Sequence, residues 1–304
     1  MRRRRSRGVL VVAAVLLLGA LAVAAQALDQ TRGPQRRRAP YFFKADPNAS
    51  GSLRPWDAIE TGAELPVFRY PLGVRSPGVI VPATDPLRQQ GKVIQDTVTP
   101  LSNFVGGVPG SDWAAVFNPP TRYYGQSGQE DWVHFRVMFP RRAYRPTSGE
   151  WNWFFESHDD SGWTRWYAAG QIQPEVPELA IGVDNDPGTR PQLFMHVRGG
   201  QDTDMHAPTA IFTDRPLRRN HWYGLMLHVI WSADPQRGLV QWWIDGKRVY
   251  SHHLADLWQR PDGSYDHVNV DFNNYRQHAS WNSTVYYGVV EIGPTQASVV
   301  LPRR

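Results

Sequence analysis

The sequence predicts an all-β protein that folds as a two-sheet antiparallel β-sandwich. Several short runs alternate between apolar and polar residues, and 25 prolines and 26 glycines are spread between them. Helical periodicity is limited to one short pattern near residues 251–258. Short strands separated by turn residues are typical of a sandwich or a barrel. The run at 221–232, HWYGLMLHVIWS, is apolar on both faces, as in a central strand of a two-layer sandwich. This run therefore favours a sandwich over a barrel.

The first 27 residues predict export. Five arginines within residues 2–7 precede an apolar run of 18 residues from Gly8 to Ala25, and Ala25-Gln26-Ala27 supplies small residues in an A-x-A pattern. These three parts describe a secretory signal peptide. The apolar run is also at the short end of what spans a bilayer, so an uncleaved anchor is the alternative. Either way we expect the rest of the chain to be secreted, or held on the outer face of the cytoplasmic membrane.

The charge of the exported part argues against a nucleic-acid partner. The full chain has 33 Lys and Arg against 28 Asp and Glu, and residues 1–27 hold five arginines and no acid, which leaves 28 against 28. A nucleic-acid binder would show a basic footprint on its folded part. The basic stretch at 28–40 is interpreted as a linker. We expect a membrane contact only through an uncleaved anchor.

Composition bounds the domain count and the chemistry. There is no cysteine, which excludes disulfides, thiolate metal sites and thiol catalysis. From Tyr41 onward no repeat or Ser/Gly-rich break divides the chain. We therefore expect one monomeric sandwich domain at 41–304, a length sufficient for a single core.

The run DWVHFRVMFP at 131–140 has the clean alternation of a half-buried strand. Strand geometry directs alternate side chains to opposite faces. The apolar face is Val133, Phe135, Val137 and Phe139, and the opposite face is Trp132, His134 and Arg136.

The next run, WNWFFESHDDSGW at 151–163, carries the most suggestive polar group. Simple alternation puts Phe154 with Glu156 and His158, and Trp151 with Trp153 and Phe155 on the other face. A histidine beside carboxylates can be a tuned general base. The alternative is a surface turn whose polar residues are only hydrated.

Later strands follow in order. The run QLFMHVRGG at 192–200 sets Leu193, Met195 and Val197 opposite Phe194, His196 and Arg198. After the apolar run at 221–232, the segment GLVQWWIDGKRVY forms two strands around Asp245-Gly246, a dipeptide suited to a tight type I′ hairpin. The run STVYYGVVEIG at 283–293 closes the meander.

Aromatic content indicates a carbohydrate ligand. Thirteen tryptophans and twelve tyrosines exceed what one core normally requires, and these rings offer a flat apolar face with a polar edge, which suits sugar rings. Several of them, including Trp132, Trp151 and Trp153, stand next to polar residues.

We expect no cofactor. An oxygen-rich segment at Asp184-Asn185-Asp186, and the pair Asp202 and Asp204, could hold a structural Ca²⁺, but neither has the spacing of a defined calcium loop. Serine-hydrolase and phosphate-cradling motifs are absent from the sequence.

From about Tyr41 to Gly293 the chain resembles secreted polysaccharide lyases of the concanavalin A-like jelly-roll class, which includes heparin lyase and alginate or glucuronan lyases. Four segments carry the resemblance: DWVHFRVMFP, FFESHDD, the long hairpin HWYGLMLHVIWSADPQRGLVQWWIDGKRVY, and VNVDFNNYRQHASWNSTVYYGVVEIG. FFESHDD is similar to the family's Gln-x-His segment, and the last is similar to its Lys-x-Gly-x-Tyr-x-Gln strand. The resemblance implies β-elimination on a uronic-acid polysaccharide.

Position by position, the resemblance implies that His158 and Tyr275 are the catalytic residues, and Gln277 matches the glutamine after the tyrosine. Glu156 stands where the family has Gln, Asp271 replaces its Lys and Asn273 replaces its Gly. The arginine that holds the substrate carboxylate has no counterpart in Trp113-Ala114-Ala115. The substrate-binding set expected here is therefore Arg136, His134, Trp132, Glu156, His196, Arg198, Arg276 and Gln277.

Three functions stay open. The first is an exported lyase with a rearranged site, which the retained histidine and tyrosine favour. The second is a non-catalytic carbohydrate-binding module, which the missing arginine favours. The third is a glycoside hydrolase that uses Glu156 with Asp159 or Asp271, if the two carboxylates flank the scissile bond.

Overall fold

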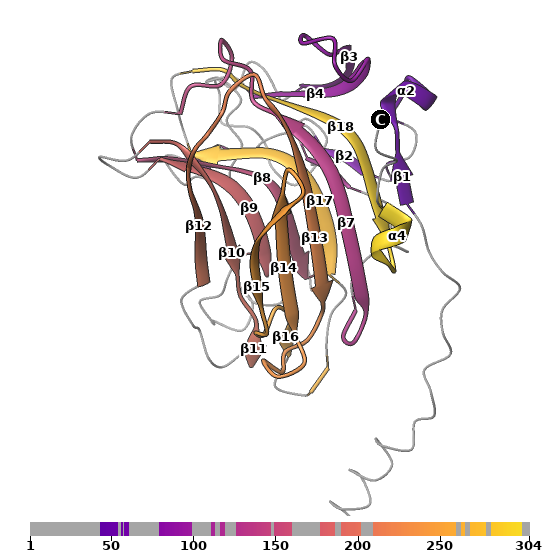
Figure 1. Ribbon diagram of the computed structural model, residues 1–304, viewed down its shortest axis with the longest axis vertical. Coiled ribbons are helices and arrows are strands. Elements are labelled where there is room, and N and C mark those ends of the chain that lie inside the picture. Colours follow the sequence, from indigo (N-terminus) through magenta and orange to yellow (C-terminus); the bar gives the residue numbers. More distant parts are fainter. Residues whose placement is uncertain are drawn as a thin grey trace, which may run out of the picture. The chain divides into compact units, whose positions relative to one another are not determined.

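The alternating runs form the strands of two antiparallel sheets, as the computed structural model of the chain shows (Figure 1). The structure describes residues 43–53, 56, 58–60, 79–98, 111–112, 116–118, 126–146, 149–159, 177–185, 190–201, 209–259, 263–264, 268–277 and 281–299. The chain divides into two units, Met1–Tyr41 and Phe42–Arg304, and all described residues lie in the second. The predicted leader and linker lie outside the described residues.

Sheet A is the first of the two sheets, and its strands run in the order β15-β14-β13-β7-β18-β4-β3, with β1 also paired to β18. Their bounds are β1 Phe43–Ala45, β3 Val79–Thr84, β4 Lys92–Val98, β7 Glu130–Met138, β13 Trp222–Ile230, β14 Leu239–Ile244, β15 Lys247–His252 and β18 Ser283–Gly293.

Sheet B is the second sheet, with the order β12-β10-β9-β8-β17-β6-β2 and with β5 also paired to β17. Its strands are β2 Ala58–Glu60, β5 Ser111–Asp112, β6 Val116–Asn118, β8 Glu150–Asp159, β9 Leu179–Asn185, β10 Gln192–Val197, β12 Thr209–Pro216 and β17 Val268–Gln277. A short parallel pair, β11 Gly200–Gln201 and β16 Trp258–Gln259, stands apart from both sheets.

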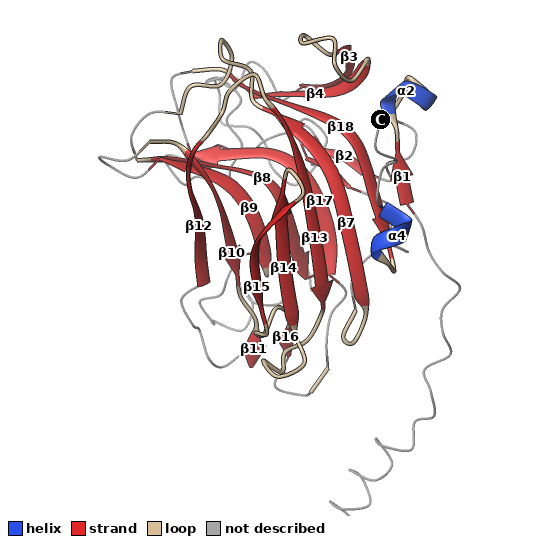
Figure 2. Ribbon diagram, viewed as in Figure 1, coloured by secondary structure: helices blue, strands red, loops and turns tan. Residues whose placement is uncertain are grey.

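Helix is nearly absent from the described part of the chain (Figure 2). It holds two short helices, α2 Pro47–Ser50 and α4 Gln296–Val299. None of the helices in that part is long and apolar enough to cross a membrane. The predicted all-β antiparallel sandwich is confirmed.

Aromatic side chains from both sheets meet between the layers. Phe135 of β7 stacks on Phe155 of β8 at 5.4 Å and meets Phe272 of β17 edge-on at 5.1 Å between ring centroids. All three rings are buried. This contact fixes which face of each strand points inward, so the alternate residues of β7 point away from sheet B.

The predicted hairpin between β14 and β15 is present. Asp245 and Gly246 both have positive φ, 51° and 78°, which is the backbone of a type I′ turn. The Asp245 carboxylate accepts a hydrogen bond from the Gly224 backbone N–H at 2.9 Å, so the turn is tied back to β13.

The helical expectation near residues 251–258 is wrong. This segment ends β15, continues as extended chain and enters β16. Its backbone is hydrogen-bonded to other segments, as in Asp256 N–H to the Ser232 carbonyl at 2.9 Å and Gly200 N–H to the Leu257 carbonyl at 3.0 Å. These long-range partners replace the bonds that a helix would make within the segment.

Candidate functional site

A β-bulge in β8 changes which side chains share the outer face of sheet B. The register between β8 and β9 pairs Trp153 with Gly182 and Glu156 with Ala180, with an irregularity between Trp153 and Phe155. Gly182 and Ala180 are two residues apart on one face of β9, so Trp153 and Glu156 share that face. The expectation that the tryptophans and Glu156 lie on opposite faces is therefore wrong, because the extra residue, Phe154, turns inward to the core.

Across sheet B the register aligns outward-facing residues in rows that cross the strands. The first row, here called the aromatic row, is Tyr275, Trp153, Phe194 and Phe212, from β17, β8, β10 and β12. Trp153 and Phe194 lie 4.5 Å apart between ring centroids, and Phe194 stacks on Phe212 at 5.8 Å. Trp151 meets the Tyr275 ring edge-on at 5.2 Å and extends the aromatic surface.

Gly182 occupies the β9 position of the aromatic row. A Cβ atom there would stand 2.7 Å from Trp153 Cε3 and 2.7 Å from Phe194 Cε1. Both rings therefore extend over the backbone of β9, into space that only glycine leaves open.

The second row places Asp271 of β17, Glu156 of β8, Ala180 of β9 and His196 of β10 side by side. Glu156 is 4% exposed, and Asn273 Nδ2 donates a hydrogen bond to its Oε2. Burial raises the pKa of Glu156 to about 8, against the opposing effect of the bond from Asn273. Burial therefore favours the protonated, uncharged form of Glu156 at neutral pH.

His196 is the other titratable group of the second row. Burial, with the nearby Arg198 charge as a smaller cause, lowers its pKa to about 4. At neutral pH its imidazole is uncharged, and a neutral imidazole offers one N–H donor and one acceptor nitrogen. Its ring meets Trp153 edge-on at 4.9 Å.

The third row follows from the backbone bonds that continue these strands. Glu178 N–H donates to the Ser157 carbonyl at 3.0 Å, and Arg198 N–H donates to the Glu178 carbonyl at 2.7 Å. Residue 158 pairs with residue 269 of β17. His158, Glu178 and Arg198 thus lie level with one another on three neighbouring strand segments. The side chain of His158 lies outside the described residues.

Arg198 is a cation on this face that could bind a ligand, because the described contacts do not pair its guanidinium. Its guanidinium makes no salt bridge within the described ranges, and its Nε is buried without a hydrogen-bond partner there. Burial lowers the pKa of Arg198 below its ordinary value, yet an arginine stays charged at neutral pH. A guanidinium that makes no salt bridge among the described residues, beside an uncharged histidine, favours an anionic ligand.

The strand positions of the two residues expected to be catalytic lie apart. Tyr275 pairs with Trp153, whereas position 158 lies beyond Glu156 on the same strand. Four steps of β9 separate these register positions, which is about 13 Å along the strand direction. The polar row of Glu156 lies between them.

Trp132, His134 and Arg136 do not belong to this site. They stand on β7 of sheet A, on the face opposite Phe135, and therefore point away from sheet B. The alternation was predicted correctly, but alternation alone does not say which sheet of the sandwich carries a strand.

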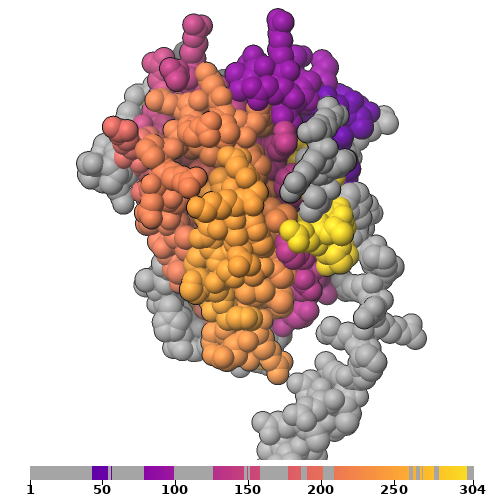
Figure 3. Space-filling model, viewed as in Figure 1, coloured from indigo at the N-terminus to yellow at the C-terminus, as the bar shows by residue number. Residues whose placement is uncertain are grey.

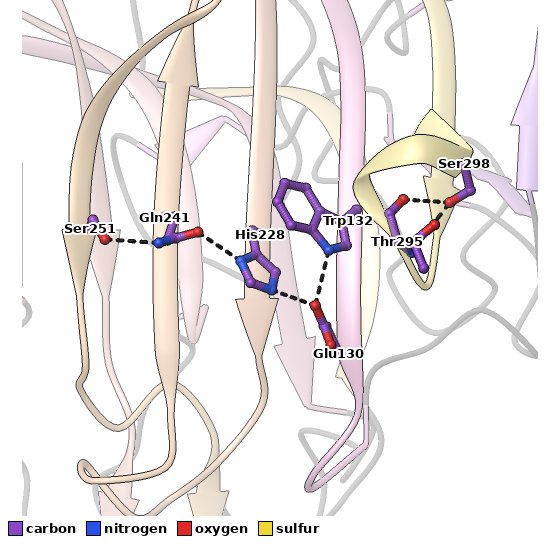
Figure 4. Close-up of polar contacts among 7 residues, drawn as sticks. All are labelled: Glu130, Trp132, His228, Gln241, Ser251, Thr295 and Ser298. Carbon is purple, nitrogen blue, oxygen red and sulfur yellow. Dashed lines mark hydrogen bonds and ion pairs between the residues drawn. The ribbon is translucent and has the colours of Figure 1, made fainter. Parts of the chain in front are cut away.

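Trp132 and His134 have partners of their own on sheet A, and two partners of Trp132 are drawn in Figure 4. Trp132 stacks on His228 at 4.0 Å and donates from Nε1 to Glu130 at 3.1 Å. It is 8% exposed, so no ring face is free for a sugar. His134 pairs with Glu291 at 3.7 Å. Figure 3, viewed as in Figure 1, has atoms of β14 and β15 in front.

Arg276 also leaves the substrate-binding set. It is 1% exposed, its guanidinium lies 4.8 Å from the Trp281 ring centroid, and Nη2 donates to the Trp281 carbonyl at 2.9 Å. It is a buried structural cation. The side chain of Gln277 lies outside the described residues.

The glycoside hydrolase pair is not supported by the register. Glu156 and Asp271 stand directly opposite each other on neighbouring strands, so they are side by side on one surface rather than on two sides of a bond. The side chain of Asp159 lies outside the described residues.

For calcium, the described residues hold no group of three or more His, Cys, Asp or Glu side chains suited to a metal. Asp184 and Asn185 end β9, and Asn185 Nδ2 donates to the Pro146 carbonyl at 3.3 Å. Asp186, Asp202 and Asp204 lie outside the described residues, and the calcium expectation stays a prediction.

Sequence reasoning missed the position of Glu178 between His158 and Arg198 in the third row, and the role of Gly182. Glu178 is 1% exposed. It directly precedes β9, and no sequence motif around it indicates a buried polar residue. The glycine in LAIGVDN, an interruption of an apolar strand, was the available sign that something approaches the backbone there.

Comparisons with known proteins agree with this fold. A family model described as "Polysaccharide lyase" matches residues 49–266. An endo-β-1,4-glucuronan lyase from the fungus Trichoderma reesei superposes with a TM-score of 0.60 at 14% identity, over 85% of this chain and 97% of that one.

Two more distant structures are the alginate lyase Aly36B and the cellulose-induced protein Cip1, both with TM-scores of 0.46. Aly36B is 14% identical and covers 66% of this chain and 80% of its own; Cip1 is 11% identical and covers 83% and 97%. None of the curated proteins is significantly similar in sequence.

Proposed function

Because this chain belongs to the polysaccharide lyase family, we propose that it cleaves a uronic-acid-containing polysaccharide by β-elimination on the outer face of sheet B. The observation that carries the proposal concerns Arg198. Its guanidinium makes no salt bridge among the described residues, and its strand position is level with that of His158. An anionic sugar would neutralise it.

The chemistry requires such a cation. β-Elimination removes the proton on the carbon next to the uronate carboxylate, and the enolate-like intermediate forms only where that negative charge is stabilised. Arg198 supplies the charge that the family's missing arginine would supply. Glu156 adds no opposing charge at neutral pH, since burial raises its pKa to about 8.

His158 is the proposed base and Tyr275 the proposed acid for the leaving oxygen. A general base must come within hydrogen-bond reach of its proton. The separation of about 13 Å between the two strand positions requires both side chains to reach toward the Glu156 row if they serve one bond. The proposal therefore rests first on His158 and Arg198.

The decisive experiment is an ultraviolet absorbance assay on alginate, glucuronan, heparin-type and hyaluronan-type polymers. We expect a rise from the unsaturated uronic product with one polymer. His158→Ala and Arg198→Ala should abolish that rise, whereas Arg136→Ala, an arginine on sheet A, should leave it unchanged. Retained activity in Arg198→Ala would overturn the role given to this guanidinium.

A second candidate function is a non-catalytic binding module, and one observation favours it: the register separates Tyr275 from position 158. In that case no polymer would give an absorbance rise, and one of them would still retard the protein in an affinity gel.

Export is part of the same proposal. A polysaccharide outside the cell does not cross the cytoplasmic membrane intact, and the leader-like pattern at 1–27 would carry the enzyme to it.

A further inference from the structure

We propose that Tyr287 is a positioning residue for the outer face of sheet B, although it belongs to β18 of sheet A. Its hydroxyl lies between the sheets and holds the bulges of β8 and β17 from the core side. These bulges carry the side chains of the candidate site. The inference rests on the proposed function only for the reaction whose rate is to be measured.

The bulges of β8 and β17 lie at the same level of sheet B. In the register between these two strands, the single residue Phe154 of β8 lies opposite two residues of β17, Asn273 and Asn274. Phe154 is also the extra residue of β8 against β9. A bulge disrupts the ladder locally, and buried backbone groups that leave a ladder need other partners.

The Tyr287 hydroxyl is such a partner. It donates a hydrogen bond to the Phe154 carbonyl at 2.7 Å and lies 2.5 Å from the Asn273 carbonyl oxygen. One O–H therefore serves both bulges. The side chain is fully buried, and burial raises the pKa of Tyr287 well above its ordinary value of 10.0, so the hydroxyl keeps its proton. A hydroxyl in the core is costly unless it is hydrogen-bonded, and here the two bulges supply the acceptors.

A second contact from β18 anchors the bulge of β17. Ser283 Oγ donates to Asn274 Oδ1 at 2.7 Å, and Asn274 Nδ2 donates to the Ser283 carbonyl at 2.9 Å. Asn152 Nδ2 donates to Asn274 Oδ1 at 3.1 Å and to the Tyr275 carbonyl at 2.9 Å. The side chains of Ser283, Asn274 and Asn152 are buried. Sheet A therefore holds this bulge at two points along β18.

The bulges set the placement of side chains on the outer face. Asn273 lies against the Tyr287 hydroxyl with its carbonyl, and its side chain donates to Glu156 Oε2. The hydroxyl is thus one residue away from the Glu156 pair, on the opposite side of the sheet. Trp153 and Tyr275 flank the two bulges in the register. A shift of the bulges would move these groups relative to one another, and a misplacement of about 1 Å can lower a rate roughly a hundredfold.

The test is Tyr287→Phe, which removes the hydroxyl and keeps the ring in the core, so the fold should be retained. We expect kcat for elimination to fall by about tenfold, because the reacting groups lose their alignment. We also expect faster amide hydrogen exchange in β8 and β17, since the bulges lose their shared donor. Exchange is measured by mass spectrometry at a temperature equally far below the unfolding midpoint of each variant.

Tyr223→Phe is the matched control. Tyr223 and Tyr287 both pair with Val137 of β7, from its two sides, and both rings are buried. The Tyr223 hydroxyl accepts a hydrogen bond from the Arg218 backbone N–H at 2.6 Å instead of serving a bulge. Its loss should cost comparable stability and leave kcat and the exchange of β8 and β17 unchanged.

Two outcomes would overturn the inference. One is a Tyr287→Phe chain whose kcat and whose exchange in β8 and β17 equal those of Tyr223→Phe. The other is faster exchange with an unchanged kcat, since the bulges would then not align the reacting groups. If the unaltered chain eliminates no polymer, the proposed function fails. The hold of Tyr287 on the two bulges is then decided by the exchange measurement alone, which needs no substrate.

Discussion

At the scale of single residues, the site is governed by which side chains keep their charge. Glu156 is almost fully buried on the outer face of sheet B, hydrogen-bonded by Asn273 and opposite Asp271. A carboxyl in that place favours its protonated form because desolvation penalises the anion. In shape and charge it then resembles the glutamine that the family resemblance implies at this position.

Glu156 should make the stability of the protein fall as pH rises. Its pKa is raised from the ordinary 4.5 to about 8, so the folded state holds a proton that the unfolded state releases. The stabilising contribution is complete below about pH 4.5 and is lost as pH rises toward about pH 8. Asp131, whose pKa burial raises to about 7, adds to the same slope.

Glu156→Gln should remove its share of this slope. We expect the variant to lose less unfolding free energy between about pH 5 and about pH 9 than the unaltered chain, by an amount of order 3 kcal/mol. Urea unfolding at both pH values measures it. Equal slopes in the two proteins would show that Glu156 is not protonated in the folded state.

At the scale of elements, the register and the bulges position the site. β8 carries an extra residue at Phe154, and β17 has an irregularity between Phe272 and Tyr275. These two irregularities place Trp153 and Tyr275 opposite each other. They also place both residues on the same face of the sheet as Glu156. A bulge commonly re-aims side chains next to a functional surface.

The β14–β15 hairpin offers a clean test of backbone conformation. Gly246 has φ of 78° and a Cβ there would meet nothing within 4 Å, so Gly246→Ala should destabilise the fold by about 1 kcal/mol through backbone strain alone. Gly224→Ala is the control, since that glycine has no positive φ and equal free space. Thermal unfolding compares them, and equal midpoints would contradict the strain argument.

At the scale of the whole molecule, the two candidate arginines for ligand binding, Arg136 and Arg198, lie on different sheets and face different surfaces. Arg136 lies on the outer face of sheet A and Arg198 on the outer face of sheet B, so only one of them can meet a ligand bound over β8 and β17. This division is why the Arg136 and Arg198 variants form a matched pair for the elimination assay.

The leader predicted at 1–27 can be tested by expression of the full sequence. Expressed with this segment, the protein should be recovered outside the cytoplasm with Leu28 as its first residue, because the A-x-A pattern ends at Ala27. Intact-mass measurement of the exported protein checks the cleavage. A membrane-bound product that still begins at Met1 would identify the segment as an anchor.

The sequence by itself determined the class of fold, the Asp245-Gly246 hairpin and the alternation of faces along β7 and β10, because strand alternation and turn chemistry are local properties of the chain. It also pointed to the FFESHDD and NNYRQ segments that β8 and β17 carry side by side. Only the tertiary structure decided that Trp151 and Trp153 share a face with Glu156, that Arg198 rather than Arg136 or Arg276 lies on that face, and that burial raises the pKa of Glu156. Those outcomes depend on a bulge, on long-range register and on burial, and each of these is set by partners distant in the sequence.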